Sequence, residues 1–307
     1  MIPHALGIPF GALLFASIPA KVFWPYFTGV VILAVGIFTY SKEVFQSRGI
    51  NKLVTLSPIF FAVPMAVFAS QHFTETKGVS TLVPRWLPGH IFWTYFIGTA
   101  IIAAALGIAS KKQARLAAIL FAVLLLSFEL FLHLPNILVR PRNVIAWAIA
   151  LRDLSFCAGA LAFAGTWTEQ QQPASANILV TLARIFLSVS AIFYGIVHFL
   201  HPEFMPAVDF DRTMPSWVPA PHFWSYLAGA VFLIAGIGFL VNRKTRLAAT
   251  ALGIFVLVLV LFVYLPILAA KPSDINEGLN FFVSTLAYAG AVLLLARATP
   301  ADARMSA

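Results

Sequence analysis

The sequence predicts an all-α membrane protein: a polytopic helical bundle of about nine transmembrane helices that contains two parallel four-helix repeats. Three observations predict this class. Of the 307 residues, 61% are hydrophobic and only 10% are charged, whereas an average soluble domain has about 25% charged residues. Apolar stretches of the length needed to cross ~30 Å of hydrocarbon recur along the chain. The second half also repeats residues of the first half at a constant offset.

The composition also excludes several functional classes. A mean hydropathy of +0.91 and 29 Phe exclude a disordered protein, a nucleic-acid-binding domain and an ordinary soluble enzyme, because so little polar surface cannot cover a water-facing globule. The net charge of +9 follows from membrane topology alone, since Lys and Arg concentrate in cytoplasmic loops. The single cysteine, Cys157, excludes intramolecular disulfides, Cys-x-x-Cys chemistry and cysteine-rich metal centres.

Helices of about 20 apolar residues account for almost the whole chain. The predicted spans are residues 22–40, 53–73, 90–110, 116–139, 143–167, 177–200, 222–241, 247–270 and 278–296. The apolar segment Ala5 to Ser17 is too short for a further span and is expected to lie in the outer membrane interface.

The basic residues predict the orientation of these spans. An odd number of spans places the termini on opposite sides, and one side collects most of the cations: Lys42, Arg48, Lys52, Lys111, Lys112, Arg115, Arg184, Arg243, Lys244, Arg246, Arg297 and Arg304. By the positive-inside rule this side is cytoplasmic. We therefore expect a multi-pass protein of the plasma (inner) membrane with its amino terminus outside and its carboxyl terminus in the cytoplasm.

An internal repeat organises the chain. A shift of 131 residues superimposes Pro84, Trp86, Pro88, Phe92, Trp93, Tyr95, Gly98, Arg115, Pro135 and Gly159 on Pro215, Trp217, Pro219, Phe223, Trp224, Tyr226, Gly229, Arg246, Pro266 and Gly290. The predicted organisation is an outer amino-terminal segment with one extra span (1–50), a first four-helix unit (51–168), a cytoplasmic linker (169–176) and a second four-helix unit with a short tail (177–307). An even number of spans in each unit makes the repeat parallel, which is less typical of alternating-access transporters than an inverted repeat.

These repeated motifs resemble the DoxX-like family of small four-helix membrane proteins. The resemblance lies in His72-Phe73 and His198-Phe199, in the P-x-W-x-P loops at 84–88 and 215–219, and in the F-W-x-Y-x-x-G and R-L-A-A motifs that follow each loop. It implies quinone-linked oxidation of sulfur compounds or membership of another membrane redox assembly. The chain departs from the family at one position, since the glutamate that members often carry three residues after the helix glycine is replaced by Ile32, Ile101 and Phe232.

Ionisable residues inside the spans provide the principal candidate site. A charge near the bilayer centre costs ~2.5–3.5 kcal/mol and usually faces a partner in the bundle interior. Glu129 and Arg152 reach a similar depth on antiparallel spans, which predicts a buried ion pair with Asp153 close by; His133 shares the helix face of Glu129. The pair either fixes helix packing or forms a proton-linked site for a quinone head group, in which Glu129 moves protons and His133 hydrogen-bonds a carbonyl oxygen.

The second unit lacks this group of charges. Its residues at the positions of Glu129, His133, Arg152 and Asp153 are Val260, Tyr264, Val283 and Ser284. Their joint replacement supports one constellation and shows that the fold does not require it.

Further candidates lie at the predicted outer ends of the spans. His72 with Glu75, and His198 with His201, sit at helix ends across a loop from His90 and His222. The residues proposed to contact a cofactor are Trp86, Trp217, His72 and His198. Interfacial aromatic and histidine residues are common at membrane boundaries, so the pattern disfavours haem and a divalent metal, and no metal site is predicted. The loops containing Trp86 and Trp217 form either stiff interfacial lids or the entrance for a lipid-soluble molecule. Asp209, Asp211 and Arg212 in the second loop are expected to form a solvated outward patch.

These patterns predict a quinone-linked redox component or the membrane anchor of an oxidoreductase. The alternatives are a non-enzymatic carrier for a small lipophilic molecule and a membrane assembly factor or scaffold. The expected partners are the lipid bilayer, a quinone and a redox partner protein, and nucleic acid is excluded.

Overall fold

The computed structural model describes residues 18–167, 177–210 and 212–300, and within these ranges the chain is helical with one isolated bridge between Phe204 and Thr213. The amino-terminal segment 5–17, most of the predicted linker and Asp211 lie outside the described residues. Nine helical spans long and apolar enough to cross a membrane are found in the described ranges: Ala20–Gln46, Asn51–Thr74, His90–Ser110, Ala114–Val139, Val144–Gly165, Ile178–Leu200, Pro221–Leu240, Thr245–Ala270 and Ile275–Ala298. The predicted fold class, a polytopic all-α bundle, is confirmed.

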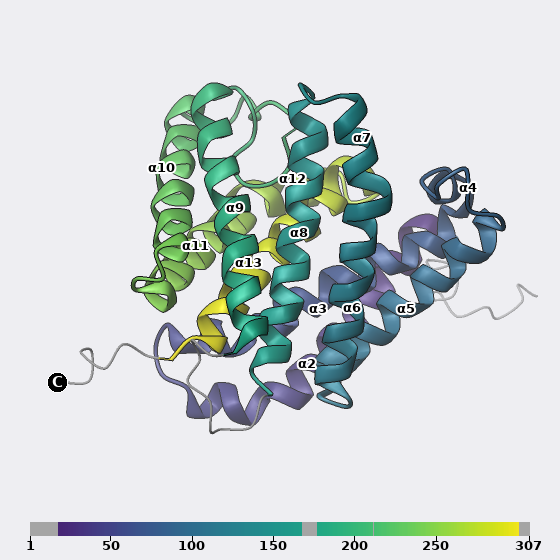
Figure 1. The fold of residues 1–307 in the computed structure, drawn as a ribbon, viewed down its shortest axis with the longest axis horizontal. Coiled ribbons are helices and arrows are strands. Elements are labelled where there is room, and N and C mark those ends of the chain that lie inside the picture. The colour runs from purple at the N-terminus through teal and green to yellow at the C-terminus, as the bar shows by residue number, and fades with distance from the viewer. Residues whose placement is uncertain (1–17, 168–176, 211, 301–307) are drawn as a thin grey trace, which may run out of the picture.

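Six of these spans are single α-helices. They are α2 (Ala20–Gln46), α3 (Asn51–Thr74), α5 (His90–Ser110), α8 (Val144–Gly165), α9 (Ile178–Leu200) and α10 (Pro221–Leu240). A short helix, α4 (Thr76–Ser80), follows α3. Figure 1 shows α8, α9 and α10 side by side, with α13 (Asn280–Ala298) running obliquely past them toward α2 and α3.

The other three spans contain a π-helical turn. Two of them run as α6 (Ala114–Phe128), η1 (Glu129–His133) and α7 (Leu134–Val139), and as α11 (Thr245–Leu259), η3 (Val260–Tyr264) and α12 (Leu265–Ala270); in the third, η4 (Ile275–Leu279) precedes α13. Pro135 and Pro266 stand in the first turn of α7 and α12. Proline lacks an N–H and its ring clashes with the carbonyl four residues earlier, so a wider turn before each proline relieves the conflict.

Equivalent elements of the two halves begin at the same offset of 131 residues. This holds for α5 and α10, for α6 and α11, for η1 and η3, and for α7 and α12. The indole Nε1 atoms of Trp93 and Trp224 each donate to the carbonyl of the last proline of the preceding loop, Pro88 and Pro219, at 3.1 Å. The offset read from the sequence therefore also relates local structure.

The two halves interlock, because the last helix of each packs on the first helix of the other. Helix α8 packs along α9, and α13 packs along α3 much more extensively than on α9. Side-chain hydrogen bonds join both pairs: Ser155 Oγ donates to Ser190 Oγ at 2.6 Å, and Gln71 Nε2 donates to Asn280 Oδ1 at 2.6 Å. This exchange brings α8 and α13 into contact with each other near the centre of the molecule.

Two glycines allow these close approaches. A Cβ added at Gly159 on α8 would lie 2.6 Å from Ala291 Cβ on α13, and one at Gly290 would lie 2.7 Å from the backbone nitrogen of Phe61 on α3. Small residues are common where membrane helices approach closely, because packing rather than hydrophobic transfer holds such helices together.

We expect Gly290→Ala to destabilise the protein by about 1–3 kcal/mol, because the new methyl group meets the backbone of α3, which cannot move aside as a side chain could. The thermal unfolding midpoint in detergent measures this effect. Gly238→Ala is the matched control, since its added Cβ meets Ala248 Cβ at an ordinary 3.4 Å. Equal midpoints for the two variants would contradict the close crossing.

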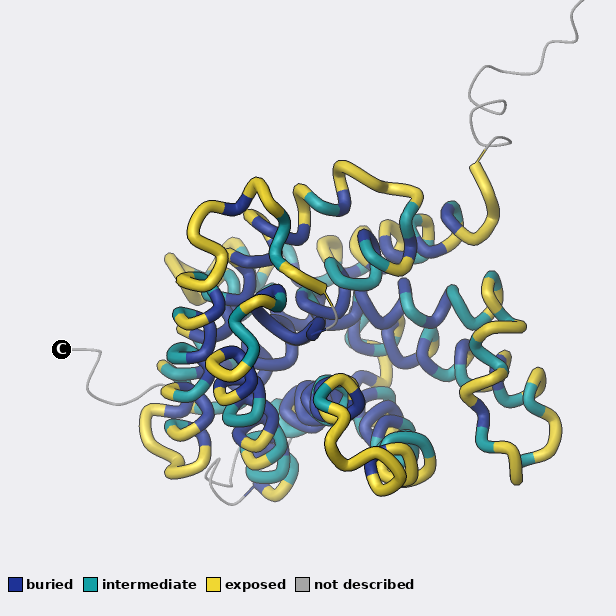
Figure 2. The backbone as a smooth tube through the Cα atoms, turned by 90° about the horizontal axis from the view of Figure 1, so that it is seen from above, coloured by how far each residue is buried: buried dark blue, intermediate teal, exposed yellow. Residues whose placement is uncertain are grey.

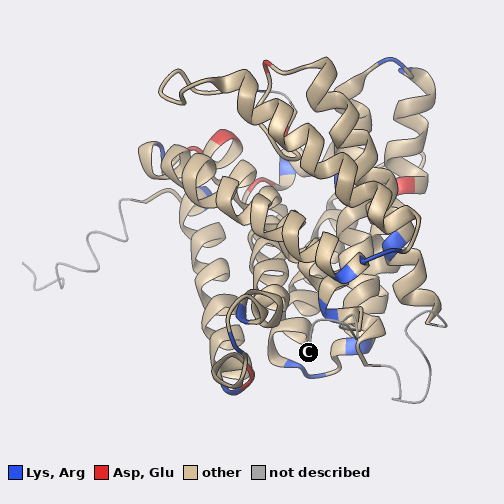
Figure 3. Cartoon of the chain, turned by 90° about the vertical axis from the view of Figure 1, so that its left-hand side faces the viewer, with Lys and Arg blue, Asp and Glu red and all other residues tan. Residues whose placement is uncertain are grey.

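Charge and burial divide the molecule into regions. Figure 3 shows Lys and Arg gathered mainly toward the end of the bundle where the carboxyl end of the chain lies. There Glu43 pairs with Lys111 and with Arg297, the latter at 3.0 Å. We call this the basic end, and we call the opposite end, with the loops at 81–89 and 201–220, the lid end. Large apolar side chains such as Phe38 and Phe45 lie exposed on the outer surface, as expected for helices that face lipid (Figure 2).

Candidate functional site

The candidate site is a chain of ionisable side chains from three parts of the sequence that meet inside the bundle. Glu129 and His133 occupy the first and last positions of η1, and Arg152 and Asp153 lie on α8. His133 Nε2 lies 3.1 Å from Asp153 Oδ2, and Arg152 Nε lies 3.2 Å from Asp153 Oδ1. The four predicted residues therefore lie together, and their side chains are mostly buried.

The predicted ion pair between Glu129 and Arg152 is wrong in its partners. Arg152 pairs with Asp153 and, through Nη1 at 3.5 Å, with Asp209 Oδ1. Neighbouring residues on an α-helix project about 100° apart. Asp153 therefore faces η1, whereas the guanidinium of Arg152 extends toward the loop that carries Asp209.

Asp209 is the residue that the sequence analysis placed wrongly. It was expected in a solvated outward patch, but its side chain is only 3% exposed. Ser284 Oγ donates to Asp209 Oδ2 at 2.5 Å, and Thr285 Oγ1 donates to the same oxygen at 3.3 Å. The apolar residues around it, Met-Pro-Ala-Val before and Phe after, are the signal that could have indicated a buried loop, since solvated loops are seldom so apolar.

Glu129 differs from the other members of the site. Its Oε1 atom is buried and accepts no hydrogen bond from any residue in the described ranges. Leaving a buried polar atom unsatisfied costs about 1–3 kcal/mol, and such atoms are rare in native proteins. Glu129 therefore presents hydrogen-bonding capacity that the described protein groups do not use.

The loop that carries Asp209 enters the bundle and is held by aromatic residues and a histidine. His198 Nε2 accepts from the backbone N–H of Ala207 at 3.0 Å, and His198 Nδ1 donates to Tyr194 O at 2.5 Å. Ala207 has a φ of +113°, a strained value for a residue with a Cβ. Tyr264 Oη also donates to Pro206 O at 2.8 Å. Both ring nitrogens of His198 are thus engaged in fixing the loop.

We expect His198→Ala to loosen residues 204–210, because it removes the acceptor for Ala207 N–H and a ring packed 4.7 Å from that of Phe210. Hydrogen exchange of these amides measures the change, and a rise of at least tenfold is expected for Ala207. His72→Ala is the matched control, since the printed hydrogen bond of His72 stays within α3, to Phe68 O at 3.1 Å. Unchanged exchange at Ala207 would show that His198 does not hold the loop.

The other predicted cofactor residues lie away from the ionisable chain. Trp86 and Trp217 are 66% and 55% exposed at the lid end, and the ring of Trp86 packs edge-on against Phe131 of η1 at 5.8 Å. His72 packs against Gly98 of α5. The described residues contain no group of three or more His, Cys, Asp or Glu that could hold a metal ion, so the histidines at the lid end do not converge there as the sequence suggested.

The nine apolar helices define the class of the protein, an integral membrane protein that crosses the bilayer several times. Comparison with known families adds two matches. Residues 179–265 match the family model DoxX, and residues 61–130 match a different model, described as a domain of unknown function (DUF8561). No curated protein and no solved structure shows significant similarity to the chain. The DoxX resemblance is therefore supported in the second half, while the first half, which carries most of the ionisable chain, matches a domain without an assigned function.

Proposed function

We propose that the protein binds a quinone head group beside Glu129 and His133 and serves as the membrane-embedded quinone component, or anchor, of an oxidoreductase. The unpartnered Oε1 atom of Glu129 is the observation that carries the proposal. A ligand for this site must reach it from the bilayer and must offer polar atoms to a carboxyl group and an imidazole. A quinone meets both requirements, since it joins an apolar body to two carbonyl oxygens.

The arrangement of the three nearest groups suits proton exchange with such a ligand. His133 is oriented by Asp153 at 3.1 Å, as a histidine that handles protons usually requires. Asp153 is in turn held by Arg152 at 3.2 Å, which keeps its negative charge compensated. Glu129 remains available to give or take a proton at the ligand oxygen.

Reduction of a quinone to a quinol consumes two electrons and two protons. In this proposal a redox partner protein supplies the electrons, and Glu129 and His133 each pass one proton to a quinone oxygen. The single Cys157 cannot supply the electrons as a dithiol, since the chain contains no second thiol. The reverse reaction, quinol oxidation, uses the same two groups as proton acceptors.

Extraction of the purified protein with organic solvent, followed by mass spectrometry, tests the proposal. We expect the native protein to carry quinone above the detergent background and Glu129→Gln to lose it, because the amide cannot exchange a proton with the ligand. Glu75→Gln is the control, an exposed carboxyl group at the lid end changed in the same way. Equal quinone in native protein and Glu129→Gln, or none in either, would refute the assignment.

A scaffold is the second candidate function, favoured by the contacts of Asp209. This side chain joins Arg152 on α8 to Ser284 on α13, and so ties the two halves together. In that case the ionisable chain only fixes packing, and no ligand is retained. A carrier for a small lipophilic molecule would instead retain a ligand that undergoes no redox change, which the mass of the extracted compound would reveal.

The orientation and ancestry of the chain belong to the same proposal. We place the basic end in the cytoplasm and the lid end outside, because Lys and Arg gather at the first of these. We also propose that both halves derive from one DoxX-like unit, which is supported by the elements that recur at an offset of 131 residues.

A further inference from the structure

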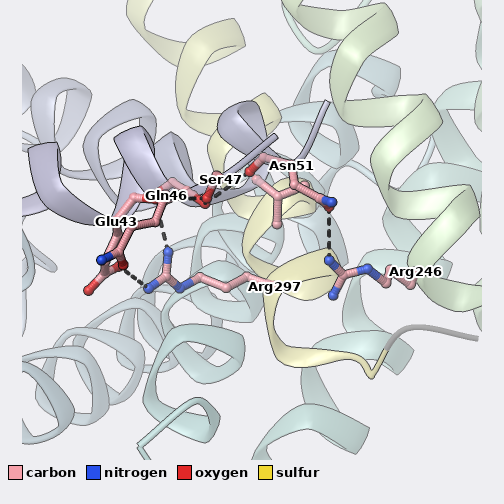
Figure 4. Close-up of a pocket in the computed structure, with 8 residues that line it drawn as sticks. Glu43, Gln46, Ser47, Asn51, Arg246 and Arg297 are labelled. Carbon is pink, nitrogen blue, oxygen red and sulfur yellow. Dashed lines mark hydrogen bonds and ion pairs between the residues drawn. The ribbon is translucent and has the colours of Figure 1, made fainter. Parts of the chain in front are cut away.

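A cleft at the basic end lies far from the ionisable chain and is lined by polar and basic side chains. It has a volume of about 460 Å³ and lies between the end of α2, the beginning of α3, the beginning of α11 and the end of α13. Figure 4 shows Arg246 and Arg297 extending toward the residues of α2 and α3 across this cleft. The other lining residues are Glu43, Gln46, Ser47, Asn51, Val54 and Thr55.

Arg246 carries a positive charge that no carboxylate in the described ranges neutralises. Its Nη1 atom donates to the carbonyls of Ala296 at 3.1 Å and Thr299 at 2.9 Å, and its Nη2 atom donates to Asn51 Oδ1 at 3.2 Å. These acceptors are all neutral. They hold the guanidinium in place at the rim of the cleft and leave its charge uncompensated.

Arg297 adds a second cation, and the balance of the cleft stays positive. Arg297 pairs with Glu43, but Lys111 pairs with the same carboxylate. One negative charge thus faces three positive charges when Arg246 is included. Arg297 Nη1 is further fixed by Thr55 O at 3.1 Å. An anion that enters the cleft therefore meets preorganised cations, which lowers the entropic cost of binding.

The position of the cleft indicates the kind of anion. It lies where four spanning helices begin or end, which is the depth of the lipid head groups. Its lining includes the apolar Val54 next to the polar residues. We propose that this cleft binds the phosphate of an anionic phospholipid, with the phosphate between Arg246 and Arg297 and the acyl chains leaving toward the bilayer. Basic pockets between membrane helices recognise such head groups.

Native mass spectrometry of the protein from nanodiscs that contain phosphatidylglycerol and phosphatidylcholine tests this site. We expect the native protein to retain phosphatidylglycerol preferentially. Arg246→Gln should reduce that preference roughly fivefold to tenfold, as expected for one interfacial cation that contributes about 1 kcal/mol or slightly more. Arg243→Gln is the control, because it removes the same charge from an exposed position outside the cleft.

A second variant separates binding from folding, because Arg246 also caps the end of α13. Gln46→Glu adds a carboxylate to the cleft and removes none of its described hydrogen bonds, so it should reduce the preference to a similar degree in a folded protein. Gln113→Glu makes the same change at the basic end outside the cleft. If Gln46→Glu and Gln113→Glu retain phosphatidylglycerol equally, the site is not the cleft.

Inorganic phosphate distinguishes the source of the anion. If phosphate alone raises the unfolding midpoint of delipidated native protein but not that of Gln46→Glu, and no lipid preference exists, the cleft binds a soluble phosphate group and the lipid assignment fails. No phosphate effect and no preference between the two lipids would overturn the site altogether. Because none of these variants touches Glu129 or His133, quinone retention is expected to stay at the native level in all of them.

Discussion

Replacing Arg152 with Met is expected to destabilise the folded protein by about 3–5 kcal/mol, because it leaves buried carboxylates without their cation. Arg152 contacts Asp153 at 3.2 Å and Asp209 at 3.5 Å, and the Asp209 side chain is only 3% exposed. His133 still faces Asp153 in the variant, but Asp209 keeps only hydroxyl donors, Ser284 and Thr285, among the contacts described above. A fall in the unfolding midpoint and in the yield of folded protein measures the loss.

A double variant shows whether the loss comes from unpaired charge. Asp209→Asn in the Arg152→Met background removes the buried negative charge and should restore part of the stability, so that the double variant is more stable than Arg152→Met alone. Arg140→Met is the control, since Arg140 is exposed at the end of α7. Additive losses in the double variant would show that Arg152 and Asp209 do not interact.

The second large effect is expected on ligand binding. His133→Leu should weaken the binding of a short-chain quinone at least tenfold, because a quinone oxygen loses its hydrogen-bonding partner in a site shielded from water. The fold should survive, since Asp153 keeps its contact with Arg152. Isothermal titration calorimetry of the detergent-solubilised protein measures the affinity.

The repeat offers a position-matched control for this variant. Tyr264 ends η3 as His133 ends η1, and its hydroxyl group donates to Pro206 O at 2.8 Å. Tyr264→Phe should therefore change the stability of the loop and leave quinone affinity within about twofold. His133→Gln retains a hydrogen-bond donor and should fall between His133→Leu and the native protein. A native affinity for His133→Leu would exclude the histidine from the site.

Much of the fold can be predicted from the sequence because a membrane limits the choices. Every span must satisfy its backbone internally and extend through the hydrocarbon, so apolar stretches of about 20 residues identify helices directly. The predicted spans agree with the nine observed helices within a few residues at most ends. The membership of the ionisable group was also predictable, since an intramembrane charge at Glu129, Arg152 or Asp153 needs a nearby partner.

The remaining features depend on packing between distant segments. The sequence does not reveal that α8 packs on α9 and α13 on α3, because four-helix units joined by short loops look alike whether they close on themselves or exchange helices. The same limitation explains the misassigned partner of Arg152. Asp209 reaches it only because the loop after α9 enters the bundle and is held there by His198. The π-helical turns depend on a local backbone conflict at Pro135 and Pro266, which helical periodicity does not reveal.

Photoaffinity labelling with an azido-substituted quinone tests the central claim most directly. The native protein in nanodiscs is irradiated with the probe, digested and mapped by mass spectrometry. The proposed site predicts labelled residues within 126–135 on η1 and its flanks or within 149–157 on α8, with labelling reduced by excess unlabelled quinone and by Glu129→Gln. Labelling confined to lipid-facing residues elsewhere, unaffected by competition, would contradict a quinone site beside Glu129.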